Sequence, residues 1–303
     1  MAADQSRGDH PISQGGLQAD SCRICTGPVH PHFQAQILGR HQVSYFRCPE
    51  CGLIQTEPPY WLAEAHGQAV SALDVGLVRR NLDFATRLEA FLTRYFHPGG
   101  RFLDYAGGYG LMVRLMRDAG YDFHRHDPYC ANIFAQGFDV SELSGQRFEL
   151  ITAFELLEHL ETPVSVVKQL LNHTESLMFS TRLQPEPVPT HVDDWWYFWP
   201  QTGQHVTFYT RPALQRLADQ TRTTLYTDGR GLHLLTRQHY TANPLHRPKG
   251  LLAALDRLLE RWQRSLRKRM VPAPGRPPSL LPEDVQRAER QLLAHNRGKG
   301  QAP

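Results

Sequence analysis

Short apolar segments and amphipathic segments alternate between residues 101 and 180 of the 303-residue chain. Four segments have the length and residue types of buried strands: "RFLDYA", "YDFHRHD", "FELITAF" and "SLMFST". Helical patterns cover residues 74–96, "GLMVRLMRDAG" and 163–171, and another follows at "RPALQRLADQ". Such alternation is typical of a parallel α/β sheet with crossover helices. We therefore predict an α/β fold, and we expect "TTLYTD" and "LHLLTR" to pair as an antiparallel hairpin.

A glycine-rich turn, "FLDYAGGYG" at residues 102–110, joins the first strand to its helix. Backbone at such a turn can approach a ligand closely, and the helix N-terminus offers free N–H groups. A dinucleotide fingerprint starting at Gly108 would end at Val113, where a small residue is needed. Asp127 ends the next strand, a position that accepts ribose hydroxyls in nucleoside-binding α/β folds. The alternative is a turn aspartate before Pro128.

Asp104, followed by Ala106, Gly108 and Gly110, resembles the acidic residue and glycines of class I S-adenosylmethionine methyltransferases, with Ala in place of the first Gly. "FELITAFELLEHLETP" resembles their fourth motif, and the resemblance runs from about residue 73 to 237. It implies a Rossmann-like sheet of seven strands with helices on both faces, and S-adenosylmethionine as cofactor. It also implies cofactor-binding residues: Asp104 near the methionine amine, Ala106, Gly108 and Gly110 along the turn, Asp127 on the ribose, Asp139 and Val140 near the adenine, and Phe154 or Glu155 at the methionine end.

Four of the five cysteines form two C-x2-C pairs, Cys22 with Cys25 and Cys48 with Cys51. Each pair suits a tight turn whose thiolates converge on one tetrahedral metal ion. In a cytosolic protein this pattern favours zinc over disulfides, and two redox dithiols are the alternative. We predict a structural Zn2+ in a small zinc-ribbon-like module over residues 21–56, with all four coordination positions taken by cysteine.

Two carboxylates and an imidazole lie close together in "FELLEH", residues 154–159. If this segment is helical, Glu155, Glu158 and His159 share one face. Three interpretations stay open. Glu155 can belong to the cofactor site while Glu158 and His159 form a pair that orders the start of the helix. His159 can act as a general base. The group can also hold Mg2+ or Mn2+, because E-x-x-E-H resembles the metal-binding segment of small-RNA 3′-end methyltransferases and of some quinone O-methyltransferases.

Seven positions from Asp193 to Trp199 hold two acids and five aromatic residues. They suit a lid over a ring-shaped or sugar substrate, with His205 and Tyr209 as polar contacts. The alternative is an aromatic plug between the main sheet and the zinc module. His191 and His205 are further candidates for a base or a metal ligand. We count His159, His205 and Tyr209 as the catalytic candidates.

Charge and hydropathy indicate what the terminal segments and residues 249–270 can form. The first 20 residues have no apolar signal region and no apolar run reaches the roughly 18 residues of a spanning helix, so we expect a disordered leader and a cytoplasmic protein. Residues 249–270 form a basic amphipathic helix that either packs on its own domain or contacts a membrane surface or a protein partner. Residues 272–303 are expected to be mostly disordered, with a short helix near 283–294.

The main functional prediction is an S-adenosylmethionine-dependent methyltransferase domain over residues 74–240 that acts on a small molecule. The cysteine module together with "GQHVTFYT" resembles a bacterial subgroup that modifies sugars or secondary metabolites, so the acceptor is expected to be a sugar or sugar nucleotide. An NAD-linked sugar epimerase or reductase is one alternative. A zinc-ribbon nucleic-acid-binding adaptor with an inactive Rossmann-like domain is another. We do not expect nucleic acid to bind, because the basic charge lies in residues 247–270 and the rest of the chain is net acidic.

Overall fold

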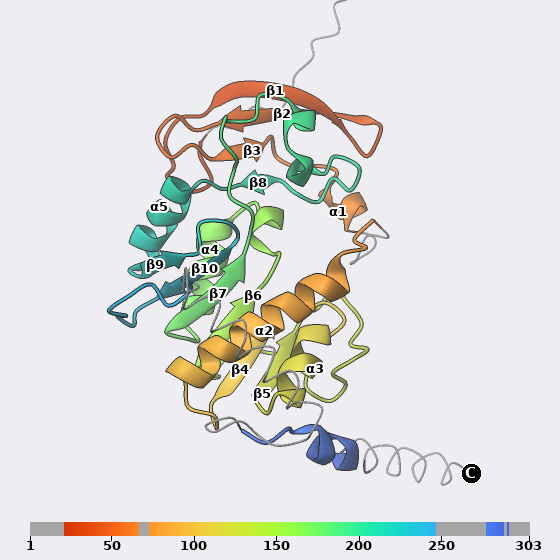
Figure 1. The fold of residues 1–303 in the computed structure, drawn as a ribbon. Coiled ribbons are helices and arrows are strands. Elements are labelled where there is room, and N and C mark those ends of the chain that lie inside the picture. The colour runs from red at the N-terminus through yellow and green to blue at the C-terminus, as the bar shows by residue number, and fades with distance from the viewer. Residues whose placement is uncertain (1–20, 67–72, 247–276, 288–289, 291–303) are drawn as a thin grey trace, which may run out of the picture.

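The computed structural model describes residues 21–66, 73–246, 277–287 and 290 (Figure 1). The predicted leader over residues 1–20, the predicted basic helix over 249–270 and much of the predicted tail lie outside these residues. Within them, no helix combines the length and the apolar character needed to cross a bilayer.

The larger sheet has the strand order β5-β4-β6-β7-β10-β9 in the described part of the chain. Strands β5, β4, β6 and β7 run parallel to one another, whereas β10 runs antiparallel to both β7 and β9. The α/β prediction and the predicted hairpin are thus confirmed. The strands are β4 (Arg101–Tyr105), β5 (Asp122–His126), β6 (Leu150–Ala153), β7 (Ser176–Ser180), β9 (Thr224–Thr227) and β10 (Leu232–Thr236).

The sheet has six strands among the described residues, not the expected seven. At its β5 edge, where a further parallel strand would pair, Arg125 and Asp139 form an isolated parallel bridge. Two backbone hydrogen bonds hold it, from Arg125 N to Phe138 O and from Val140 N to Arg125 O. The seventh strand is therefore reduced to a single bridge.

Helices cover both faces of the larger sheet, as predicted. Alternate strand residues point to opposite faces. Leu103, Ile151 and Leu177 pack with one pair of helices, and Phe102, Leu150 and Met178 pack with the other pair. The first pair is α4 (Pro163–Leu171) and α5 (Arg211–Thr221), and the second is α2 (Leu77–Tyr95) and α3 (Leu111–Asp118).

A smaller antiparallel sheet lies at one end of the molecule, with the order β1-β2-β3-β8 (Figure 1). Its fourth strand comes from far along the chain, because β8 pairs with β3. A short helix, α1 (Leu62–Ala65), follows the first three strands. The strands are β1 (His30–Ile37), β2 (His41–Arg47), β3 (Ile54–Thr56) and β8 (Thr207–Phe208).

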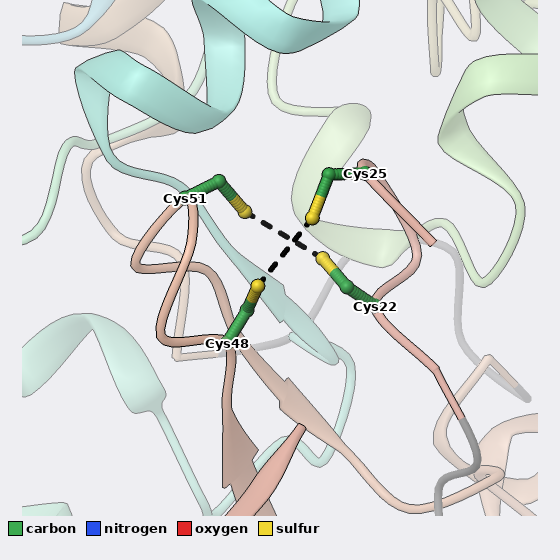
Figure 2. A group of neighbouring side chains, drawn as sticks. All are labelled: Cys22, Cys25, Cys48 and Cys51. Atoms are coloured by element: carbon green, nitrogen blue, oxygen red, sulfur yellow. Dashed lines mark hydrogen bonds between the residues drawn. The ribbon is translucent and has the colours of Figure 1, made fainter. Parts of the chain in front are cut away.

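The cysteine loops pack against both the small sheet and the main domain. Figure 2 shows the four sulfur atoms converging from two turns. Cys22, Cys48 and Cys51 are buried in the same apolar cluster as Leu103 of β4 and Leu214 of α5. The small sheet and the main domain therefore share one core at this point.

The aromatic segment at residues 193–199 has both buried and exposed side chains. Trp195, Tyr197 and Phe198 are buried against the small sheet, in one cluster with Tyr45 and Phe208. These three form the predicted plug. Trp196 of the same segment is 65% exposed. The segment contains two short 3-10 helices, η2 (Val192–Asp194) and η3 (Trp196–Phe198).

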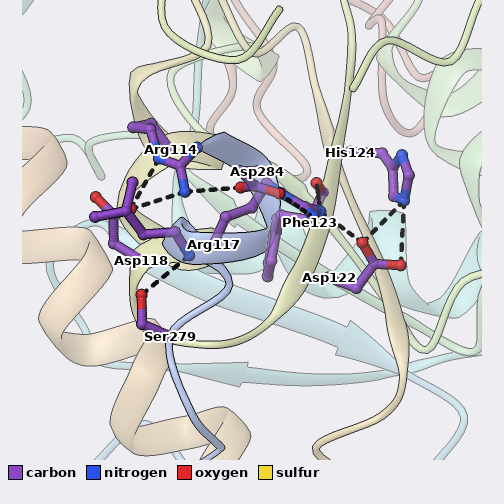
Figure 3. Close-up of polar contacts among 9 residues, drawn as sticks. Arg114, Arg117, Asp118, Asp122, Phe123, His124, Ser279 and Asp284 are labelled. Atoms are coloured by element: carbon purple, nitrogen blue, oxygen red, sulfur yellow. Dashed lines mark hydrogen bonds and ion pairs between the residues drawn. The ribbon is translucent and has the colours of Figure 1, made fainter. Parts of the chain in front are cut away.

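The described part of the C-terminal tail, residues 277–287, returns to α3 (Figure 3). Asp284 accepts two 2.9 Å hydrogen bonds from the buried Arg117, and Arg114 lies 2.9 Å from the same carboxylate. Leu280 N donates to Arg117 O at 3.1 Å. Residues 281–287 are helical and overlap the short helix predicted near 283–294. A carboxylate of this helix neutralises arginines that α3 partly buries.

Candidate functional site

The glycine turn after β4 has the backbone that its sequence predicts. Ala106, Gly108 and Gly110 all have positive φ, at 56°, 54° and 85°. A Cβ added to Gly107 would lie 2.8 Å from Asp104 Oδ2, whereas one added to Gly108 would meet nothing within 4 Å. The left-handed backbone at Gly108 favours glycine, and a Cβ added there would project into open space. The motif did not single out Gly107, but the structure shows that a side chain would not fit there.

The turn opens onto a cavity of about 180 Å³ at the carboxyl end of the parallel strands. Open α/β sheets bind their ligands at this edge. The cavity brings together residues predicted from three separate motifs. They are Asp104, Ala106 and Gly108 of the turn, Phe154, Glu155 and His159 of "FELLEH", and His205.

Asp104 is a buried carboxylate on the floor of this cavity, 4% exposed. Thr152 Oγ1 donates a 2.6 Å hydrogen bond to Asp104 Oδ1. Burial raises the pKa of Asp104 to about 7, against the opposing effect of that hydrogen bond. A buried carboxylate of this kind favours a cationic ligand group, because the cation restores the stability of its charged form.

Asp127 lies beside the turn, and its carboxylate binds backbone N–H groups. Oδ2 accepts from Gly108 N at 2.9 Å, and Oδ1 accepts from Tyr129 N at 2.9 Å and Cys130 N at 3.0 Å. Asp127 therefore fixes the conformation of the glycine turn, as the turn-aspartate alternative predicted. Its contact with a ribose stays a prediction.

Arg125 is a site residue that sequence reasoning missed. Its guanidinium is buried behind the turn, where Nε donates to Gly108 O at 2.6 Å and Nη1 donates to Asp139 Oδ1 at 2.6 Å. Asp139 also accepts from Asn132 Nδ2 at 2.7 Å. Arg125 takes the inward position two residues after the buried Phe123, and an arginine at such a position is a signal that could have revealed it. Asp139 and Val140 lie at the isolated bridge, outside the lining of the cavity.

Glu155 has a strained backbone at the end of the strand, with a φ of 51°. Its N–H donates to Ser180 Oγ at 2.7 Å, and Ser180 Oγ donates to Glu155 Oε1 at 2.6 Å. Arg80 Nε lies 3.5 Å from Glu155 Oε2. The preceding Phe154 stacks on Phe84 with 4.6 Å between ring centres. Glu155 therefore lines the cavity, and its carboxylate forms an ion pair with Arg80 of α2.

The expectation that Glu155, Glu158 and His159 share a helical face is wrong. Only Leu157–His159 form a single 3-10 turn, η1. Glu158 points away from the cavity and is fully buried, whereas Glu155 and His159 line it. The left-handed backbone of Glu155 ends the strand before any helix can form.

Glu158, His159 and His205 form a second cluster, in which one potential ligand atom of each lies within 4.8 Å of the others. His159 Nδ1 donates to Gln204 O at 3.1 Å, and His205 Nδ1 donates to Tyr197 O at 2.7 Å. Each neutral ring therefore keeps a lone pair on Nε2. The two rings meet edge to face, 4.9 Å apart.

Burial sets the charge of this cluster. It raises the pKa of Glu158 to about 8, and it holds the pKa of His159 well below its usual range. It also lowers the pKa of His205 to about 4. At neutral pH both histidines are uncharged, and they can accept a proton or donate a lone pair to a metal ion.

Two of the predicted polar candidates do not reach the cavity. The Tyr209 hydroxyl is buried and donates to Leu157 O at 2.9 Å, so it supports η1 from behind. His191 begins η2 at the surface, where its Nδ1 accepts from Asp193 N at 3.3 Å. Tyr209 and His191 therefore make contacts that support the local backbone.

The four cysteine sulfurs form a compact group (Figure 2). Cys22 Sγ and Cys51 Sγ are 3.6 Å apart, Cys25 Sγ and Cys48 Sγ are 3.4 Å apart, and all four lie within 4.8 Å. These distances exceed the roughly 2.05 Å of a disulfide. They approach the ~3.8 Å edge of a tetrahedron with Zn–S bonds of about 2.3 Å. The geometry thus fits four thiolates around one ion.

The comparisons with known proteins agree on the central part of the chain. Residues 78–221 match the family model described as "Methyltransferase domain". The matched segment covers just under half of the 303-residue chain. The matched segment holds the glycine turn, "FELLEH" and His205. A search of curated proteins found no match for the chain.

The solved structures that resemble this chain do so distantly. CalO1, a methyltransferase in calicheamicin biosynthesis solved in its SAH-bound form, is 14% identical, with a TM-score of 0.37 over 59% of this chain and 67% of its own. OxaC with SAH and oxaline is 14% identical, with a TM-score of 0.40, and this chain spans only 46% of it. Magnesium protoporphyrin IX methyltransferase (ChlM) from Synechocystis PCC 6803 with bound SAM is 12% identical, with a TM-score of 0.36 over 58% of this chain and 91% of its own.

Proposed function

We propose that the methyltransferase domain binds S-adenosylmethionine and methylates a small-molecule acceptor. The observation that carries this proposal is the cavity at the glycine turn. Its lining includes the open backbone at Gly108, the buried carboxylate of Asp104 and the neutral His159 and His205. A cationic nucleoside cofactor and a proton acceptor both have a place there.

The residues around the turn fit the parts of that cofactor. The buried Asp104 carboxylate, which has no cation bound to it directly in the described residues, would hold the ammonium group of the methionine moiety. The backbone from Ala106 to Gly110 would lie along the cofactor, with Asp127 toward the ribose and Asp139 and Val140 toward the adenine. When bound, S-adenosylmethionine supplies an electrophilic methyl group on sulfur.

His159 and His205 are the groups that can take a proton from the acceptor. Each has Nδ1 bound to a carbonyl oxygen, which leaves Nε2 as the basic atom. Both histidines line the cavity, whereas Glu158 is fully buried and does not line it. Loss of the acceptor proton to Nε2 would raise the electron density on the attacking atom, and the cavity walls would hold the two reactants in line.

A divalent cation is a second candidate at the same place. Glu158 Oε2 is buried without a hydrogen-bond partner in the described residues. One carboxylate oxygen of Glu158 lies within 4.8 Å of a ring nitrogen of each histidine. One carboxylate and two imidazoles form a donor set for Mn2+ or a similar ion, and Mg2+ fits less well. Glu158, His159 and His205 would hold the ion, which would polarise the acceptor oxygen. Glu155 would not, because Ser180 and Arg80 engage its carboxylate.

The cysteine group is proposed to hold one structural zinc ion. Arg23, between the first two cysteines, donates to Val206 O and to Thr207 Oγ1 at 2.9 Å. Val206 N in turn donates to Glu158 O at 2.8 Å. The zinc loop would therefore support the segment that carries His205, as well as the small sheet.

The acceptor class is proposed from the sequence resemblance, which points to a sugar or sugar nucleotide. The domain boundaries at residues 21–56 and 74–240 also stay predictions. Isothermal titration with S-adenosylmethionine and with NAD tests the central proposal. We expect binding of S-adenosylmethionine alone. Binding of NAD without a response to S-adenosylmethionine would contradict the proposal.

A further inference from the structure

A second and larger cavity adjoins the proposed cofactor cavity. It measures about 1000 Å³ and shares Arg80, Phe84 and Glu155 with the first. Its other walls come from α2, from Arg182 after β7, from the turn at residues 228–231 and from Trp196. A molecule bound in this second cavity could place one end beside Glu155 and the histidines.

The second cavity has an excess of positive charge. Five arginines and three carboxylates line it. Three arginines are paired, Arg79 with Asp83, Arg80 with Glu155 and Arg87 with Asp228. Arg182 and Arg230 have no acidic group within the 4.0 Å of a salt bridge among residues 21–66, 73–246 and 277–287. Two guanidinium groups therefore face the cavity without a counter-charge.

The backbone that carries these two arginines is firmly held. Asp228 Oδ1 accepts from the N–H groups of Arg230 and Gly231, both at 2.9 Å, while Arg87 donates to Asp228 Oδ2 at 2.8 Å. Leu183 N donates to Arg230 O at 3.2 Å, which ties the turn to the end of β7. The Arg182 guanidinium lies 6.0 Å from the centre of the exposed Trp196 ring. Hydrogen bonds therefore hold in place the backbone segments that carry Arg182 and Arg230.

We propose that Arg182 and Arg230 form a phosphoryl-binding subsite for the methyl acceptor. Guanidinium groups bind phosphoryl oxygens through paired, charge-assisted hydrogen bonds, and two of them match a group with two or more negative charges. The acceptor would lie across the second cavity, its phosphoryl group on the arginines and its reacting atom toward His159 and His205. This inference rests on the proposed methyltransferase function, since it names the acceptor of that same site.

Binding of inorganic pyrophosphate tests the subsite without knowledge of the acceptor. Titration calorimetry on the full chain should show binding to the wild type and a loss of about ten- to a hundredfold for each of Arg182→Gln and Arg230→Gln, the range expected for one charge-assisted contact. Arg216→Gln is the matched control, because Arg216 is exposed on α5 and lies outside the cavity. It removes the same charge and should leave the affinity unchanged. Circular dichroism on each variant checks the fold.

Three outcomes would overturn the subsite. They are no binding of pyrophosphate to the wild type, an equal affinity in the Arg182→Gln/Arg230→Gln double variant, and binding of malonate as tight as that of pyrophosphate. The last outcome would assign the arginines to carboxylates. S-Adenosylmethionine binding is measured on the same samples and should survive in the double variant. If the wild type binds pyrophosphate through these arginines but does not bind S-adenosylmethionine, the proposed function fails while the subsite stands.

Discussion

Tyr197 donates a 2.6 Å hydrogen bond to Glu158 Oε1, and both side chains are buried between the small sheet and the main domain. The other carboxylate oxygen, Oε2, has no partner among the described residues. Burial keeps the pKa of Glu158 near 8, so the cofactor-free protein holds this side chain neutral at pH 7. The aromatic segment is thereby linked to the cluster that contains both candidate bases.

Removing the Tyr197 hydroxyl should destabilise the fold. Tyr197→Phe leaves a buried carboxyl group without its donor, which costs about 1–3 kcal/mol. Tyr45→Phe is the matched control, because the Tyr45 hydroxyl is buried without a partner in the described residues. Its loss should be neutral or slightly stabilising. Thermal unfolding followed by circular dichroism compares the two. Equal destabilisation by both changes would argue against the role of the Glu158 contact.

Gly108→Ala should prevent cofactor binding, because its Cβ would project into the open space beside the turn. The change also strains the backbone by about 1–2 kcal/mol, since φ is positive. Gly145 has the same kind of φ, 70°, and equally open surroundings, but lies outside the cavity. Gly145→Ala should therefore show a similar loss of stability with normal affinity for S-adenosylmethionine. If both variants keep that affinity, the cofactor does not contact Gly108.

His159→Ala should lower turnover by about 10²–10⁴-fold with little change in cofactor affinity, the range for a lost general base. His191→Ala is the control, because His191 lies at the surface on η2. Steady-state turnover and titration calorimetry separate the two effects. Turnover that needs added Mn2+ or Mg2+, and that is lost in Glu158→Gln, would assign the cluster to a metal ion. A loss of less than about threefold in His159→Ala would exclude the base.

Cofactor affinity should rise with pH between 5 and 7.5. The pKa of Asp104 is raised from 3.8 to about 7 by burial, and the ammonium group binds the charged form. Binding below pH 7 should thus release a proton, which calorimetry in two buffers detects. In the absence of cofactor, the folding stability changes with pH in the opposite direction. The contribution of Asp104 to stability is present below pH 3.8 and is lost as the pH rises through 7. Asp104→Asn should abolish both dependences.

Purified protein should contain one zinc ion per chain by elemental analysis. Cys48→Ser should release it and lower the thermal stability of the whole protein in a single transition, because Cys22, Cys48 and Cys51 share a core with α5 and the main sheet. Turnover should fall as well, since Arg23 links the zinc loop to the backbone of Val206, next to His205. Two separate transitions, with the cofactor-binding one unchanged, would instead indicate an independent module.

The main sheet and half of the site could be predicted because their signals are local. Central strands such as β6 and β7 are short and mostly apolar, and the carboxyl ends of parallel strands meet at one edge, which places Asp104 near His159. The separation of Glu155 from Glu158 could not be predicted, because it depends on one left-handed residue at a strand end. The role of Tyr209 also depends on long-range packing against Leu157. A pairing as short as β8 with β3 leaves no pattern in the sequence.

The pairing of β8 with β3 has a consequence for the order in which the protein can assemble. A ribosome makes the cysteine loops and the first three strands of the small sheet long before it reaches Thr207 and Phe208. Until then Ile54 and Gln55 lie on an unpaired strand edge, which can recruit a strand from another nascent chain. Chains that stop before residue 207 should therefore aggregate during synthesis even with zinc present.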